Sequence, residues 1–192
     1  DRMFDVNVKA AIFLTGALAP AMAGRGAGAV LNVSSNAAFF GFSGGGHFAH
    51  RFAILRPEKL WAATIGAPGS VTLLDPSRDW WVGVRDLKEK FGIAFDPAAM
   101  AQIPVQMIVG EADLETWEIT HKEGGTYWMP GANDAGKTRP QRLAALRDSF
   151  EKAGVKVQFD LLPGVSHERM KTLNTVQDFL AGVLAQRRST AR

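Results

Sequence analysis

The sequence of 192 residues contains no cysteine, and this absence excludes several kinds of site at once. Without a thiol the chain forms no disulfide, has no cysteine nucleophile and binds no metal through thiolates. The apolar stretch "AAIFLTGALAPAMAG" is broken by Pro20 and is shorter than the roughly 20 residues that span a bilayer. We therefore expect no membrane span, and we expect a cytoplasmic protein unless a leader was removed.

The chain also lacks a large net charge, because lysine and arginine exceed the acidic residues by only three (22 against 19). Part of this excess lies in the tail "QRRSTAR", and no basic stripe with interleaved aromatic residues occurs elsewhere, so we expect no binding to nucleic acid. The length and the 46% of hydrophobic residues predict one compact globular unit. Because the chain begins at Asp1 without a methionine, we expect a trimmed chain or a fragment of a longer protein.

Short apolar runs alternate with helical patterns from residue 37 onward. The predicted strands are "AAFFGF", "LWAATIGAP", "VQMIVG" and "VKVQFDLLPG", and the preceding run "AVLNVS" adds a fifth. The predicted helices are residues 4–23, "GGGHFAHRFAILRP", a segment near 84–91, "RPQRLAALRDSFEKAG" and "ERMKTLNTVQDFLAGVLAQRR". This alternation predicts an α/β fold, in which a mostly parallel sheet of about five strands carries helices on both faces.

The segment "GFSGG" at residues 41–45 matches the pattern G-x-S-x-G. It follows a predicted strand and opens a predicted helix, the setting in which a strained turn exposes a serine hydroxyl at the top of a sheet. Small residues at 41, 44 and 45 let the strand and the helix pass close together. The pattern indicates Ser43 as a nucleophile and Gly44 as the residue whose backbone N–H faces a developing oxyanion.

A serine nucleophile needs a histidine base and an acidic residue that orients the histidine. Both occur in the expected chain order, each just beyond a predicted strand: Asp113 in "MIVGEAD" and His167 in "LLPGVSHE". Glu111 and Glu115 compete with Asp113 for the acidic role. The alternative, a serine in an ordinary glycine-rich turn, explains the motif alone but not its two partners.

The segments "GFSGGGHFAHRF", "PVQMIVGEAD" and "DLLPGVSHE" together resemble the α/β-hydrolase family, in particular its bacterial esterase-like and depolymerase-like members. The resemblance covers about residues 38–185. It implies Ser43 as nucleophile, His167 as general base and then acid, and Asp113 as the orienting carboxylate. The implied activity is hydrolysis of a small-molecule carboxylic ester through an acyl-enzyme, with no cofactor.

Aromatic residues and histidines elsewhere raise two further questions. The aromatic candidates for an acyl pocket or lid, or else for a satellite core, are Trp80, Trp81, Tyr127 and Trp128. His47 and His50 stand three residues apart on the helix after the serine motif. No nearby carboxylate or further histidine accompanies them at a ligand spacing, so we expect packing or surface groups and no metal site.

The first 38 residues resemble a different family, the short-chain dehydrogenases/reductases. The resemblance rests on "VNVKA", which contains Asn7, and on "NVSS", which places Ser35 at that family's catalytic serine. The chemistry needs a tyrosine about 13 residues after the serine and a lysine four residues further, and these positions hold Phe48 and Phe52. The glycine-rich nucleotide-binding turn is absent as well, so we expect no reductase activity.

We interpret the chain as a chimera, in which a reductase-like helix–strand segment (1–38) is packed into the same domain as the C-terminal part of a hydrolase (39–192). Natural recombination and an accident of cloning or assembly both fit this interpretation. Complete α/β-hydrolases have several strands before the serine motif, and a loop among them supplies a second oxyanion-hole N–H. We therefore expect a truncated α/β-hydrolase fold with weak activity.

A sheet cut beside its nucleophile strand exposes an apolar edge, and such edges are normally paired or covered. This predicts a homodimer formed through the N-terminal edge. The alternative function, from a different class, is a catalytically inactive remnant that folds and oligomerises without turnover.

Overall fold

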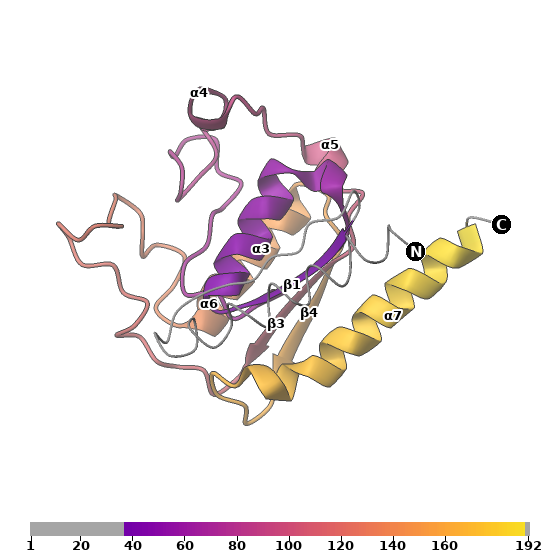
Figure 1. The fold of residues 1–192 in the computed structure, drawn as a ribbon. Helices are drawn as coiled ribbons and strands as arrows, with labels where there is room; N and C mark the ends of the chain where they lie inside the picture. Colours follow the sequence, from indigo (N-terminus) through magenta and orange to yellow (C-terminus); the bar gives the residue numbers. More distant parts are fainter. Residues whose placement is uncertain (1–36, 191–192) are drawn as a thin grey trace, which may run out of the picture. The chain divides into compact units, whose positions relative to one another are not determined.

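The computed structural model describes residues 37–190, which Figure 1 shows as a coloured ribbon. The chain divides into two units between Ala37 and Ala38. The predicted helix at 4–23, the predicted strand "AVLNVS" and Ser35 lie outside the described residues. The reductase-like segment, the chimera and the homodimer through the N-terminal edge therefore stay predictions.

Four strands form one sheet in the order β1–β2–β3–β4. Their bounds are Ala37–Phe42 for β1, Leu60–Gly66 for β2, Val105–Gly110 for β3 and Val157–Leu162 for β4. The β2–β3 and β3–β4 pairs are parallel, with Ala63 opposite Val105 and Val105 opposite Val157. The α/β fold class and four of the predicted strands are confirmed, whereas the predicted fifth strand falls outside residues 37–190.

Helices cover both faces of the sheet, with α3 and α6 on one face and α7 on the other (Figure 1). Their bounds are Gly44–Leu55 for α3, Leu87–Phe91 for α4, Pro97–Met100 for α5, Arg139–Lys152 for α6 and Leu173–Thr190 for α7. The predicted final helix begins later than its pattern suggested, because a 3-10 turn occupies Arg169–Thr172. No helix among the described residues is long and apolar enough to cross a membrane.

Strand β3 is buried along its whole length, which explains its continuous apolar run. Val105, Met107 and Val109 join the hydrophobic core that includes side chains of α3 and α6. The intervening Gln106 faces α7 and donates from Nε2 to the Thr175 carbonyl at 3.2 Å. It also accepts a hydrogen bond from Thr64 at 3.1 Å, so its buried amide is paired on both sides.

The passage of α3 against β1 and β2 depends on two glycines. A Cβ at Gly41 would clash with the Gly45 backbone, and a Cβ at Gly46 would clash with the Gly66 carbonyl. The prediction that Gly44 and Gly45 allow the close passage is wrong, because a Cβ at either position meets nothing within 4 Å. Gly41 does have the predicted role, and Gly46 has it one turn into the helix.

Two histidines of α3 fasten the loop that follows β2. Nε2 of His47 accepts the Ser70 N–H at 2.9 Å, and Nε2 of His50 accepts the Thr72 N–H at 3.0 Å. His50 also donates from Nδ1 to the Gly46 carbonyl at 2.7 Å, which fixes its tautomer. The prediction of packing groups is confirmed for His50, which is fully buried.

Both histidines are held in the neutral form. Burial and then the charge of Arg51 lower the pKa of His47 to about 4, with smaller contributions from His121, Arg139 and Arg142. Burial, again followed by Arg51, lowers the pKa of His50 well below its ordinary value near 6.5. A proton on either Nε2 would set an N–H against a backbone N–H and break the contact.

Gly46→Ala should lower the free energy of unfolding by about 1–3 kcal/mol, because main-chain atoms of α3 and β2 would have to separate. Gly45→Ala is the matched control, since its Cβ meets open space inside a helix. It should raise the free energy of unfolding by about 0.5–1 kcal/mol. Urea unfolding of both variants measures the difference, and equal effects would refute the proposed contact.

The free energy of unfolding should fall as the pH drops from about 6.5 towards 4. In this window the unfolded chain protonates its histidines at their ordinary pKa, whereas His47 and His50 in the folded chain stay neutral. His47→Gln keeps an oxygen that can accept the Ser70 N–H and removes the titration. Between pH 7 and pH 4 the free energy of unfolding, measured in urea, should fall by about 2 kcal/mol less in this variant than in the wild-type chain. An unchanged slope would contradict the assignment.

Candidate active site

Ser43 stands at a sharp turn between β1 and α3. Its backbone angles are φ 58° and ψ −118°, a strained conformation for a residue with a side chain. The turn is fixed because its N–H donates to the Gly66 carbonyl at 2.8 Å and its carbonyl accepts the Gly46 N–H at 2.9 Å. The next N–H, of Gly44, has no backbone partner among residues 37–190. This is the geometry expected when a strand–turn–helix unit presents a nucleophile.

Asp113 and His167 lie on adjacent loops at the ends of β3 and β4. The two loops are tied together, since the Glu111 N–H donates to the Leu162 carbonyl and the Ala112 N–H to the Val165 carbonyl, both at 2.9 Å. Asp113 is 1% exposed, and its Oδ2 lies 2.6 Å from Nδ1 of His167. An ionised carboxylate only accepts hydrogen bonds, so His167 donates from Nδ1 and Nε2 is left as the basic nitrogen.

Glu111 and Glu115, the competing acidic residues, are both exposed, and neither is hydrogen-bonded to His167. The structure therefore brings together Asp113 and His167, as the chain order predicted.

His167 also lies beside the Ser43 turn. Its ring is 4.8 Å, centroid to centroid, from that of Phe42, the residue before the serine. Among residues 37–190 no hydrogen bond joins His167 to the Ser43 hydroxyl. Contacts of this kind are often long in the free state of hydrolases and tighten when substrate binds.

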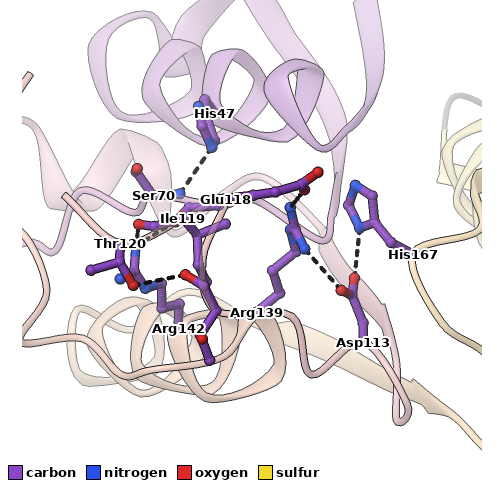
Figure 2. A network of polar contacts seen from close by, with 11 residues as sticks. His47, Ser70, Asp113, Glu118, Ile119, Thr120, Arg139, Arg142 and His167 are labelled. Atoms are coloured by element: carbon purple, nitrogen blue, oxygen red, sulfur yellow. Dashed lines mark hydrogen bonds and ion pairs between the residues drawn. The ribbon is translucent and has the colours of Figure 1, made fainter. Parts of the chain in front are cut away.

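A pocket of about 420 Å³ opens at Ser43, and Figure 2 shows the polar network around it. Its lining residues follow strand ends or begin helices: Ser43, Gly44, His47, Gly69, Ser70, Glu118, Ile119, Thr120, His121 and Arg139. A larger groove of about 830 Å³ lies where β3 and β4 begin, beside α7, and contains no serine or histidine. Ligands of open α/β sheets bind at the carboxyl ends of the strands, so the smaller pocket is the candidate site.

Arg139 connects this pocket to Asp113. Its Nη1 donates to Asp113 Oδ1 at 3.0 Å and its Nη2 to Glu118 Oε2 at 2.7 Å (Figure 2). The residue opens α6, whose start is held by Thr138, which accepts the Gln141 N–H as half of a capping box. Asp113 thus has a hydrogen-bond donor on each carboxylate oxygen, the Arg139 guanidinium on Oδ1 and the His167 imidazole on Oδ2, which compensates for its burial.

Arg142, one turn further along α6, is 1% exposed and is bonded entirely to neutral oxygens. It donates from Nη1 to the carbonyls of Gly69 and Ile119, and its other nitrogens donate to the Gly136 carbonyl and the Asn133 side chain. Burial, followed by the charge of Arg139, lowers its pKa. Arg142 therefore links two segments that line the pocket, one at Gly69 and one at Ile119. Its positive charge has no carboxylate partner among residues 37–190.

Arg51 adds a third guanidinium near the pocket. It lies 5.2 Å from the Trp81 ring centroid and donates to the Thr72 hydroxyl at 3.2 Å. Burial lowers its pKa to about 10. No ion pair joins it to a carboxylate in the described part of the chain.

A second serine–histidine pair lines the same pocket and was not predicted from the sequence. Ser70 Oγ lies 2.7 Å from His121 Nε2. The backbone of His121 is held on both its N–H and its carbonyl by the Asn133 side chain, at 3.0 and 2.8 Å. Burial, followed by Arg142 and Arg51, lowers the pKa of His121.

None of the three tryptophans predicted to bind substrate lines the pocket that contains Ser43. Trp81 contacts a residue that lines the pocket, because its ring lies 4.9 Å, centroid to centroid, from that of His121. Its Nε1 donates to the Tyr127 carbonyl at 3.1 Å. Trp80 packs against the core and Phe91, and Trp128 is partly buried. Their roles in substrate binding stay predictions.

Nothing in the described residues suggests a metal centre, since no three histidine, aspartate or glutamate side chains gather there. The Nε2 lone pairs of His47 and His50 are already used by backbone N–H groups.

The family model for short chain dehydrogenases matches residues 1–50, about a quarter of the chain. Within that range, residues 37–50 form β1, the Ser43 turn and the beginning of α3. No curated protein matches the sequence significantly.

The solved structures that resemble the chain include the following two. The poly(aspartic acid) hydrolase-1 of Sphingomonas sp. KT-1 superposes with a TM-score of 0.59 at 21% identity, over 84% of this chain and 59% of that one. The poly(3-hydroxybutyrate) depolymerase of Bordetella parapertussis superposes with a TM-score of 0.54 at 22% identity, over 82% of this chain and 52% of that one. The chain therefore spans less than two thirds of the length of either protein, and at this identity the similarity shows the fold alone: the α/β-hydrolase fold.

Proposed function

We propose that the chain is a serine hydrolase that cleaves carboxylic esters through an acyl-enzyme. The observation that carries the proposal is the hydrogen bond between buried Asp113 and His167, beside the strained turn that presents Ser43. The α/β-hydrolase fold shared with a hydrolase and a depolymerase supports the same reaction class.

The residues divide the proposed reaction between them. Ser43 Oγ attacks the ester carbonyl carbon while its proton passes to Nε2 of His167, and Asp113 stabilises the imidazolium that forms. The N–H of Gly44 donates to the oxyanion of the tetrahedral intermediate. Collapse of the intermediate breaks the bond to the leaving alkoxide, which takes the proton from His167. Water then attacks the acyl carbon while His167 takes its proton, and that proton passes to Ser43 Oγ as the acid is released.

Within residues 37–190, the site offers few hydrogen-bond donors to the oxyanion of the tetrahedral intermediate. Two donors usually share it, and losing one costs about 10² to 10³ in rate. Gly44 is the donor that residues 37–190 offer beside Ser43, so we expect slow turnover of short activated esters.

The Ser70–His121 pair is the competing candidate for nucleophile and base, because its hydrogen bond is already formed at 2.7 Å. Two features favour Ser43. Ser43 occupies the strained turn at the start of a helix, whereas Ser70 is 5% exposed, and the structure gives His121 no carboxylate partner within residues 37–190.

A fluorophosphonate probe should label Ser43, because it reports an activated serine. Peptide mass spectrometry should place the adduct on the peptide that contains Ser43, and Ser43→Ala should lose both the label and ester hydrolysis. Ser70→Ala should keep the label. An adduct on Ser70 would transfer the nucleophile to the second pair, and no adduct at all would favour the inactive remnant.

Asp113→Asn should lower kcat by roughly 10²- to 10⁴-fold, because the amide no longer stabilises the imidazolium or fixes its tautomer. Asp134→Asn is the matched control, since within residues 37–190 this exposed carboxylate pairs with Arg78 alone. Both variants are compared by initial rates on an aryl acetate, with circular dichroism to check folding. If the folded Asp113→Asn protein kept the rate of Asp134→Asn, the proposed role of Asp113 would be wrong.

A further inference from the structure

The guanidinium of Arg139 is only partly used by its two carboxylate partners. Nη1 donates to Asp113 and Nη2 to Glu118, whereas Nε is a buried nitrogen without a hydrogen-bond partner among the described residues. Buried donors are nearly always paired, so an unpaired one in a pocket calls for an explanation. Nε and Nη2 share one edge of the guanidinium, and this edge binds a carboxylate through two parallel hydrogen bonds. Glu118 uses only one of the two positions.

The two carboxylates on Arg139 differ in how firmly they are held. The side chain of Asp113 is 0% exposed and is also bonded to His167, so it cannot leave without exposing a buried charge. The side chain of Glu118 is 46% exposed, has Arg139 as its ion-pair partner and lines the pocket. Because the Glu118 carboxylate is partly solvated, it can turn to solvent at small cost when another carboxylate takes its place on the buried Arg139.

The surroundings of the pocket favour a further negative charge. Arg142 donates to carbonyls of two pocket-lining residues, and Arg51 lies over Trp81, whose ring contacts His121. Neither has a carboxylate partner within residues 37–190. Burial is the main cause of the lowered pKa of His121 and of His47, and the positive charges of Arg51 and Arg142 lower both further. Against three guanidiniums stand two carboxylates, of which Glu118 is partly screened by water.

We infer that the Nε–Nη2 edge of Arg139 binds a carboxylate of the substrate, which replaces Glu118 when it enters the pocket. The substrates are then esters that carry a free carboxylate near the scissile bond, within the 420 Å³ pocket. This assignment rests on the proposed esterase function for its reaction, but the carboxylate subsite itself can be tested without turnover.

Kinetics on a matched pair of substrates test the preference. An aryl hemisuccinate carries the carboxylate, and the aryl methyl succinate is its neutral counterpart. The wild-type chain should have a higher kcat/KM for the anionic ester, by about 10- to 100-fold, the value of a charge-assisted pair of hydrogen bonds. Equal values for the two esters would overturn the inference and leave the esterase proposal standing.

Three variants of the subsite and one control variant test whether Arg139 binds the substrate carboxylate, and the readout is the ratio of the two kcat/KM values. Arg139→Gln should bring the ratio close to one, and Arg139→Lys should lower it too, because an ammonium lacks the planar fork. Glu118→Gln should raise the ratio, since the competing carboxylate is gone. Arg147→Gln, on the same helix but paired with Asp148, should leave it unchanged. If Arg139→Gln keeps the wild-type ratio of kcat/KM for the anionic ester to kcat/KM for the neutral ester, the carboxylate subsite is refuted, even if hydrolysis of both esters is slower.

Direct binding gives a readout that is independent of catalysis. Succinate should raise the Tm of the wild-type chain and raise it more in Glu118→Gln, whereas succinamide, its neutral analogue, should not. If no ester is hydrolysed but succinate stabilises the chain, the esterase proposal fails and the carboxylate site stands. If Arg139 variants do not fold, Glu118→Gln decides: no gain in stabilisation by succinate overturns the inference.

Discussion

The buried carboxylate of Asp113 is the interaction on which the site depends. It joins three segments far apart in the sequence, because it receives hydrogen bonds from Arg139 at the start of α6 and from His167 after β4 while it belongs to the loop after β3. A charge with almost no exposure is stable only with both partners in place. Burial of this one aspartate therefore requires that the proposed base and the pocket arginine lie next to each other.

The pocket walls are held by polar groups that reach from helices to loops. His47 and His50 bind the backbone after β2 from α3, and Arg142 binds the carbonyls of Gly69 and Ile119 from α6. These polar bonds act together with apolar contacts of the same loops, since Ala67 and Val71 belong to the core and Ile119 is buried. The close contact of Gly46 with the Gly66 backbone sets the distance from α3 to β2, and hence the position of the Ser43 turn.

The four described strands, the main helices within residues 37–190 and the contact between Asp113 and His167 could be predicted from the sequence, because each follows from a local pattern: an apolar run, a helical period, or a polar residue just after a strand. Arg139, Arg142, Ser70 and His121 were missed because their roles depend on partners 21 to 73 residues away. An arginine in the first turns of a polar helix has the pattern of a solvated residue. Likewise, the sequence could not distinguish Gly46, which contacts a strand, from Gly45, which does not.

The excess of guanidinium groups bears on the proposed chemistry as well as on binding. The tetrahedral intermediate carries a negative charge that a single N–H of Gly44 stabilises poorly. In the proposed reaction, the positive charges of buried Arg142 and partly buried Arg51 would lower the energy of that charge from a distance, because both guanidiniums are already held in place by hydrogen bonds. Asp113 joins the proposed base to the pocket arginine, because one of its carboxylate oxygens accepts a hydrogen bond from Arg139 and the other accepts one from His167. If the proposed esterase reaction takes place at Ser43, guanidinium groups held near the pocket thus compensate for the single oxyanion donor that residues 37–190 offer there.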